Sequence, residues 1–137
     1  MRPSRQRVGA GARVRSGLIA FVLLGFTLLG VGCTHYVDRG SDLYYQGRYI
    51  EAAHVLEKTE PRLIGASHVE QATYGLYRGA TLLRLGDLEG ADRWLGYCQT
   101  VADRYPQVLR SDEQELLQET LIALRADLDR RAAARGF

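Results

Sequence analysis

The sequence predicts an all-α domain that follows an N-terminal export segment. Two observations support the α prediction: apolar residues recur every three to four positions in several stretches, and one stretch recurs further along the chain. The composition agrees, because 46% hydrophobic and 25% charged residues with only 3 prolines are ordinary for a globular protein. A chain of 137 residues has room for one small domain.

The first 32 residues differ in charge from the rest of the chain. They hold five of the 18 basic residues and none of the 16 acidic ones, so their formal charge is +5. The remaining 105 residues then have a formal charge of −3, although the whole chain has +2. We expect no nucleic-acid partner, because the basic excess is confined to the start of the chain.

Residues 1–32 are arranged like a secretory signal. An arginine-rich n-region, residues 1–17, precedes an uncharged h-region, residues 18–31, and Gly32 supplies a small residue before the predicted cleavage point. The uncharged run is short for a membrane-spanning helix, which needs about 20 apolar residues. We expect a cleaved leader. The alternative is an uncleaved single-pass anchor that leaves the remaining residues in the periplasm.

The end of this leader, residues 28–33 (LLGVGC), resembles the lipobox of bacterial lipoproteins. Gly32 and Cys33 match the small residue and the cysteine of that motif, whereas Gly30 stands where leucine is usual. The resemblance implies that Cys33 is acylated, with palmitate among its chains, and becomes the mature N-terminus. Several acyl chains, at about 0.8 kcal/mol per buried methylene, anchor a small domain stably. The alternative is an unmodified Cys33 close to an ordinary cleavage site.

The same resemblance implies a destination for the lipidated chain. In Gram-negative lipoproteins an aspartate after the cysteine retains the protein in the inner membrane, and here that position holds Thr34. The resemblance therefore favours the periplasmic face of the outer membrane, with the inner membrane as the alternative.

Two stretches of the mature chain align at an offset of 39 residues. Residues 44–53 (YYQGRYIEAA) align with residues 83–92 (LRLGDLEGAD), and a leucine follows at the same place in each copy, Leu56 and Leu95. In both copies a glycine separates two amphipathic stretches. This pattern predicts two helical hairpins, each turning at a glycine with positive φ.

The repeated pattern resembles the tetratricopeptide repeat, a helical hairpin of 34 residues. The first copy, at about 34–60, matches at Tyr36, Gly40, Leu43, Gly47, Tyr49, Ala52 and Leu56. The second copy, at about 67–104, matches at Gly79, Leu82, Gly86, Leu88, Ala91 and Leu95. Arg39 and Arg78 depart from the usual leucine, and the longer offset implies about five extra residues in the connector, residues 59–67.

Start signals mark the third helix and a long last one. Ser67 with Glu70 forms a capping box before the third helix, and we expect a second box at Ser111 before a helix at about 111–135. A leucine stripe runs along that last helix, at Leu117, Leu121, Leu124 and Leu128. We expect the stripe to cap the open end of the repeats. The alternative is a coiled-coil seam in a homodimer.

The resemblance implies that the first helix of each hairpin lines a groove for a protein or peptide partner. The positions that it implies are Ser41, Tyr44, Tyr45, Leu76, Ala80, Leu83 and Arg84. Tyrosine and arginine often dominate the energy of protein interfaces. Neighbouring helical residues do not share one narrow face, so we expect one of the two adjacent tyrosines to pack in the core.

No motif in the sequence points to catalysis. The histidines, at 35, 54 and 68, lack metal-ligand spacing, and no nucleophile or phosphate-binding motif occurs. We expect a non-enzymatic chain without metal or cofactor; the alternative is a small hydrolase, which a cleft with perturbed carboxylates or histidines would favour. We expect Cys98 to be a buried thiol, with an intermolecular disulfide as the alternative.

Taken together, the patterns predict a lipid-anchored adaptor in the bacterial cell envelope. Similar small repeat lipoproteins serve as assembly factors for pili, secretion channels or outer-membrane complexes. The second hypothesis is a single-pass protein with the same helical interaction domain in the periplasm.

Overall fold

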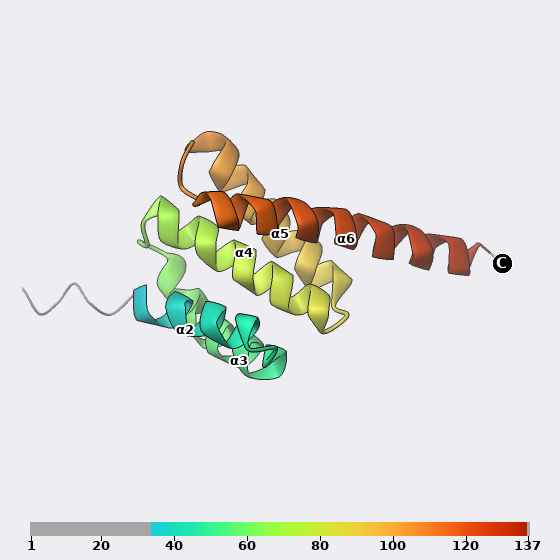
Figure 1. Cartoon of the computed structure of the whole chain (residues 1–137), viewed down its shortest axis with the longest axis horizontal. Helices are drawn as coiled ribbons and strands as arrows, with labels where there is room; N and C mark the ends of the chain where they lie inside the picture. The colour runs from blue at the N-terminus through green and yellow to red at the C-terminus, as the bar shows by residue number, and fades with distance from the viewer. Residues whose placement is uncertain (1–33, 137) are drawn as a thin grey trace, which may run out of the picture. The chain divides into compact units, whose positions relative to one another are not determined.

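The computed structural model describes residues 34–136, so the predicted leader, residues 1–32, and the predicted lipidation site, Cys33, lie outside the described residues. All regular secondary structure of the described residues is helical, and the all-α prediction is confirmed (Figure 1). The elements in chain order are α2 (Thr34–Tyr45), α3 (Tyr49–Thr59), the short 3-10 helix η1 (Glu60–Leu63), α4 (His68–Arg84), α5 (Leu88–Arg104) and α6 (Ser111–Arg135).

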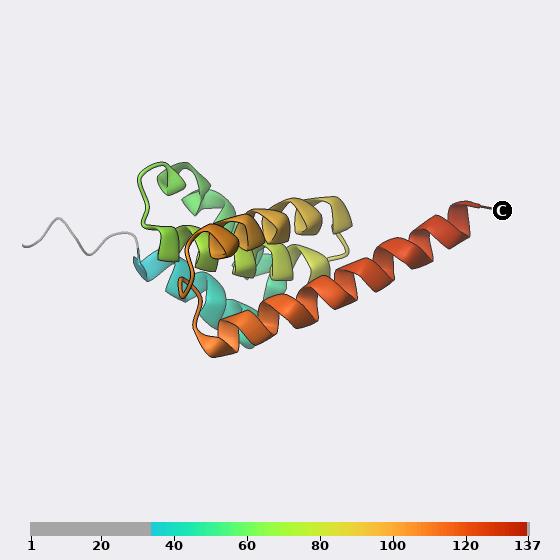
Figure 2. The same ribbon diagram turned by 90° about the horizontal axis from the view of Figure 1, so that it is seen from above.

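The helices form two packed hairpins and one added helix. α2 pairs with α3, α4 pairs with α5, and α6 packs on α4 and α5. Connectors 60–67 and 105–110 lie at the end where α2 begins, which we call the N-terminal pole (Figures 1 and 2). Connectors 46–48 and 85–87 lie at the opposite end, the far pole, and the last turns of α6 extend beyond it.

The aligned glycines close both hairpin turns in the same way. Gly47 and Gly86 have φ of 74° and 80°, a conformation that glycine adopts without steric cost. The N–H of Gly47 donates to the Tyr44 carbonyl at 2.9 Å, and the N–H of Arg48 donates to the Leu43 carbonyl at 2.9 Å. The equivalent pair of bonds closes the second turn, so both helices end in the same C-terminal capping motif. The repeat in the sequence is therefore also a repeat in backbone geometry.

The predicted capping box at the start of α4 is confirmed. The Glu70 N–H donates to the Ser67 hydroxyl at 3.2 Å, and the Ser67 N–H donates to the Glu70 carboxylate at 2.8 Å. Each side chain thus satisfies one backbone donor that the first helical turn leaves without a partner.

The predicted capping box at Ser111 is wrong, because the helix begins one residue earlier than the box requires and only half of such a box forms. The N-cap residue is Arg110, and Ser111 is the first residue of the helix. The Arg110 N–H donates to the carboxylate of Glu113 at 3.0 Å. Glu113 is buried, and the Arg110 guanidinium lies 3.2 Å from its carboxylate. This charged contact, which the sequence pattern did not include, fixes the start of α6.

Small residues bring the paired helices close together. A Cβ added to Gly79 in α4 would lie 2.6 Å from Cγ of Leu95 in α5 and 3.0 Å from its backbone nitrogen. In the first hairpin a Cβ on Gly40 would lie 2.5 Å from a methyl carbon of Leu56. In each hairpin a leucine of the second helix therefore occupies the space above a glycine of the first.

The leucine stripe of α6 faces the second hairpin. Leu117 and Leu124 are buried in the core, and Leu121 packs against it. Leu128 lies further along the helix and is exposed. The stripe is thus largely used within the chain.

The close contact at Gly79 yields a stability prediction. Gly79→Ala is expected to lower the free energy of unfolding by about 1–3 kcal/mol, because the new methyl overpacks the contact with Leu95. Gly96→Ala, on the exposed side of α5, is the matched control, since its Cβ would meet nothing within 4 Å. That control is expected to raise the free energy of unfolding by up to about 1 kcal/mol, because alanine is the better helix former.

Urea unfolding followed by the helical circular dichroism signal measures both variants. A neutral Gly79→Ala would contradict the close packing of α4 on α5.

Candidate functional site

The structure has a hollow of about 460 Å³ between the end of α2, the second half of α4 and the middle of α6. It lies on the face formed by the first helix of each hairpin, where the sequence analysis predicts a groove. We call it the groove. Its lining residues are Tyr44, Ala80, Leu83, Arg84, Leu116, Glu119, Thr120, Ala123 and Asp127.

Four of the seven predicted groove residues line this hollow, and they are Tyr44, Ala80, Leu83 and Arg84. Tyr44 is 7% exposed whereas Tyr45 is 62% exposed, so Tyr44 is the tyrosine that packs inward. Tyr45 reaches across to α4 instead, and its hydroxyl lies 3.2 Å from the hydroxyl of Tyr77.

Two other predicted groove residues, Leu76 and Ser41, do not line the groove. Leu76 is fully buried in the core, so its prediction as a partner-contacting residue is wrong: core packing leaves none of its surface for a partner. Ser41 is outside the groove lining, and its hydroxyl donates to the Asp38 carbonyl at 2.8 Å.

The sequence analysis missed the third wall of the groove. Five lining residues belong to α6, and they are Leu116, Glu119, Thr120, Ala123 and Asp127. Their spacing of three to four residues places them on one side of the helix, next to the leucine stripe. That spacing is present in the sequence, but a helix that caps the repeats accounts only for the leucine stripe beside it.

Four tyrosine rings form an aromatic cluster at the α2 side of the groove. The Tyr44 ring lies 5.5 Å from the ring of Tyr49 and 6.0 Å from that of Tyr77, and Tyr45 lies 5.9 Å from Tyr77. Burial, together with the contact to the Tyr45 hydroxyl, raises the pKa of Tyr77 far above its ordinary value. The buried Tyr77 phenol therefore stays neutral at physiological pH.

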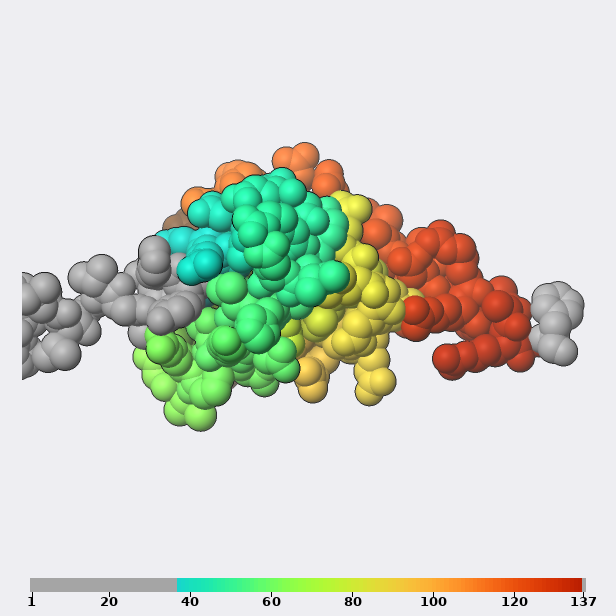
Figure 3. All heavy atoms as spheres, turned by 90° about the horizontal axis from the view of Figure 1, so that it is seen from below, coloured from blue at the N-terminus to red at the C-terminus, as the bar shows by residue number. Residues whose placement is uncertain are grey.

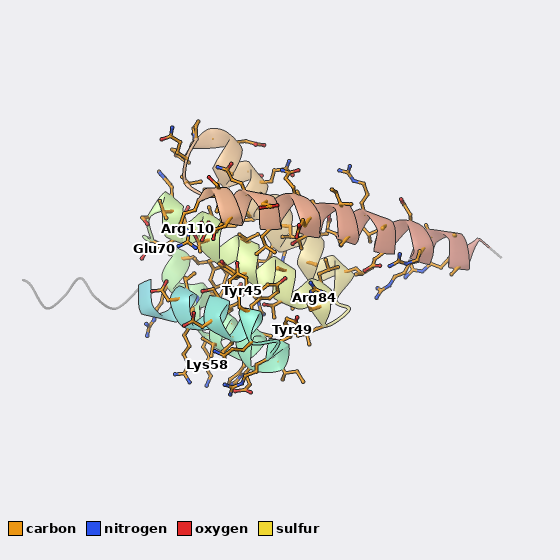
Figure 4. The ribbon with its side chains drawn as sticks, viewed as in Figure 1. Tyr45, Tyr49, Lys58, Glu70, Arg84 and Arg110 are labelled. Atoms are coloured by element: carbon orange, nitrogen blue, oxygen red, sulfur yellow. The ribbon has the colours of Figure 1, made fainter. Side chains whose placement is uncertain are left out.

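Arg84 is positioned by two of these rings. Its guanidinium carbon lies 6.0 Å from the ring centre of Tyr49, within the range of a cation–π contact. A hydrogen bond to the Tyr44 hydroxyl is the main cause that raises the pKa of Arg84. In the stick view Arg84 and Tyr49 lie close together near the far pole (Figure 4). The α2 and α4 side of the groove therefore presents a fixed positive charge.

The opposite wall of the groove is acidic. Glu119 and Asp127 project from α6, and Asp127 also pairs with Arg130 on the next turn of that helix. The groove thus has a cation with aromatic support on one side and carboxylates on the other. Such a surface suits a polypeptide segment with charges of both signs, because each charge fixes the segment's orientation.

The described residues also bear on metal and membrane sites. Between residues 34 and 136 no group of three or more histidine, cysteine, aspartate or glutamate residues is arranged to hold a metal ion. None of the helices in this range is long and apolar enough to cross a membrane.

No protein-family model, curated protein or solved structure matches this chain. The resemblances to the lipobox and to the tetratricopeptide repeat therefore remain predictions from the residues that carry them.

Cys98 occupies the α5 side of the core and is completely buried. Burial raises the pKa of its thiol to about 12, so the thiol is protonated at neutral pH.

We expect no alkylation of Cys98 by iodoacetamide at pH 8 in the folded protein and full alkylation in urea, as read by peptide mass mapping. Ile122→Cys, an exposed position on α6, is the reactive control. A disulfide-linked dimer on a non-reducing gel, with Cys98 in the bridging peptide, would contradict the burial.

Proposed function

We propose that this chain is a non-enzymatic adaptor of the bacterial cell envelope that is lipid-anchored through Cys33. In this proposal the domain of two tetratricopeptide-like hairpins and α6 binds a segment of a protein partner in the groove. The observation that carries it is the groove itself, in which an aromatic cluster and Arg84 face the carboxylates of α6. The lipobox-like end of the leader supports the anchor, and Thr34 favours the outer membrane.

The groove suits binding because its main contact groups are held before any partner arrives. The Tyr44 ring is fixed between its neighbours Tyr49 and Tyr77. Arg84 in turn contacts Tyr44 and Tyr49. Fixed side chains lose little conformational entropy on binding, so more of the contact energy appears as affinity. Tyrosine and arginine are also the residue types that most often carry interface energy.

The volume of the groove also fits a few side chains of a partner. About 460 Å³ lies within the range of roughly 300–1,000 Å³ that is usual for ligand pockets. The space lies between three helices and is lined by side chains of both charges, as a charged polypeptide segment requires. We therefore favour a polypeptide ligand over a small molecule.

The anchor has a direct test in the mature mass of the protein. We expect protein from the membrane fraction to begin at Cys33 and to carry the mass of acyl chains, because the lipobox-like segment directs both cleavage and acylation. Cys33→Ala should lose the acyl mass, and Cys98→Ala should keep it. An intact leader beginning at Met1 would instead support the uncleaved single-pass anchor.

The groove has its own test by site-specific crosslinking in living cells. A photoreactive residue at Leu83 or Glu119 is expected to trap the same partner from opposite walls, whereas one at the exposed Thr100 of α5 should not. Adding Arg84→Glu should reduce the adduct at position 119 about tenfold, which corresponds to a loss of about 1.4 kcal/mol of binding free energy. Equal adducts from all three positions, or none from the groove, would contradict the proposal.

A further inference from the structure

The N-terminal pole of the domain is joined directly to the predicted anchor. α2 begins at Thr34, so no linker residue separates Cys33 from the first helix. An extended residue spans at most about 3.6 Å, and a domain on a long linker can move away from the membrane. Here the connection is too short for that. This step rests on the proposed anchor at Cys33, and it holds equally for the uncleaved anchor.

Two connectors meet the same pole, and the first of them exposes an apolar side chain. Ile64, in connector 60–67, is 93% exposed, the most exposed large apolar residue of the described chain. Val69, at the start of α4, is 54% exposed. In the space-filling view this connector and the start of α4 lie at the edge of the molecule, on the side where α2 begins (Figure 3).

The structure of connector 60–67 explains why Ile64 is outside. Leu63, the last residue of η1, packs against the core, and Gly65 then turns the chain with φ of 105°. The N–H of Ala66 donates back to the Leu63 carbonyl at 3.2 Å, which closes the turn around Ile64. The side chain of Ile64 is therefore carried at the tip of a closed turn.

Exposure alone does not select this pole, because Ile50 at the far pole is 77% exposed. We choose the N-terminal pole as the membrane contact because of its position: connector 60–67 lies at the same end of the domain as the start of α2 (Figures 1 and 2). The charges near the tip are balanced, with Lys58 and Arg62 close in sequence to Glu57 and Glu60. A lipid contact here would therefore be apolar rather than electrostatic.

We infer that the N-terminal pole rests on the bilayer and that Ile64 inserts at the boundary between headgroups and acyl chains, with Val69 at the edge of the contact. An apolar tip beside a covalent anchor gains from burial in this boundary. α4 then rises from the membrane. Its groove residues Ala80 and Arg84 lie about 16–22 Å further along the helix than Val69, at 1.5 Å per residue. The groove is thus held at a set height above the lipid.

The test uses the full chain, purified from membranes and reconstituted in phosphatidylcholine vesicles. Ile64→Cys and the matched control Ile50→Cys are each labelled with an environment-sensitive fluorophore, and quenching by brominated lipids is measured. We expect at least threefold stronger quenching at position 64 than at 50, without change between low and high salt. Cys98 is buried and stays unlabelled, and the chain without an added cysteine is the blank, whose signal is subtracted because a Cys33 without acyl chains would also take the label.

The outcomes separate the inference from the proposed function. Equal quenching at positions 64 and 50 in vesicle-bound protein overturns the inference and leaves the anchor standing. Absence of acyl mass together with failure to float with the vesicles overturns the proposed anchor, and the inference with it. In a final variant, Ile64→Asp should remove the quenching of a label at Val69→Cys, whereas Ile50→Asp should not.

Discussion

The close approach of paired helices at a glycine is the contact on which the rest of the fold depends. Leu56 above Gly40 and Leu95 above Gly79 leave no room for even a methyl group. Because apolar side chains gain from contact on all sides, these leucines are fully buried and hold each hairpin at a fixed spacing. Each hairpin therefore enters the fold with a fixed width, and the two hairpins supply α2 and α4 to the groove.

The two hairpins are joined by polar contacts as well as by apolar packing. The Tyr74 hydroxyl donates to the Leu56 carbonyl at 2.7 Å, and the Arg78 guanidinium donates to the Ala53 carbonyl at 2.6 Å. Both side chains belong to α4 and are buried, so each bond satisfies a group that burial would otherwise penalise. Arg78 stands where the repeat that the sequence resembles has leucine, and here its guanidinium bonds to the first hairpin. The bond joins α4 of the second hairpin to α3 of the first.

The sequence predicted those features that depend on local chemistry. Gly47 and Gly86 could be predicted as turns because positive φ is a property of one residue, and the capping box at Ser67 could be predicted because its partners lie three residues apart. Leu76 was misassigned because its burial depends on neighbours from other helices, which no local pattern contains. The wall formed by α6 was missed for the same reason, since the packing of α6 places its residues opposite Arg84.

The anchor proposed at Cys33 would give the domain a polarity, because α2 begins at the next residue, Thr34. An up-and-down arrangement alternates its connectors between two ends, so an anchor attached to the first residue of the first helix assigns each connector to one side. With the anchor proposed at Cys33, connector 60–67 would lie on the lipid side, and the turns at Gly47 and Gly86, at the other end of the helices, would lie on the side away from it. A partner segment that enters the groove near Arg84 would approach from that second side. Binding and anchoring would thus use opposite ends of the same helices, so a partner in the groove would not compete with the membrane for one surface.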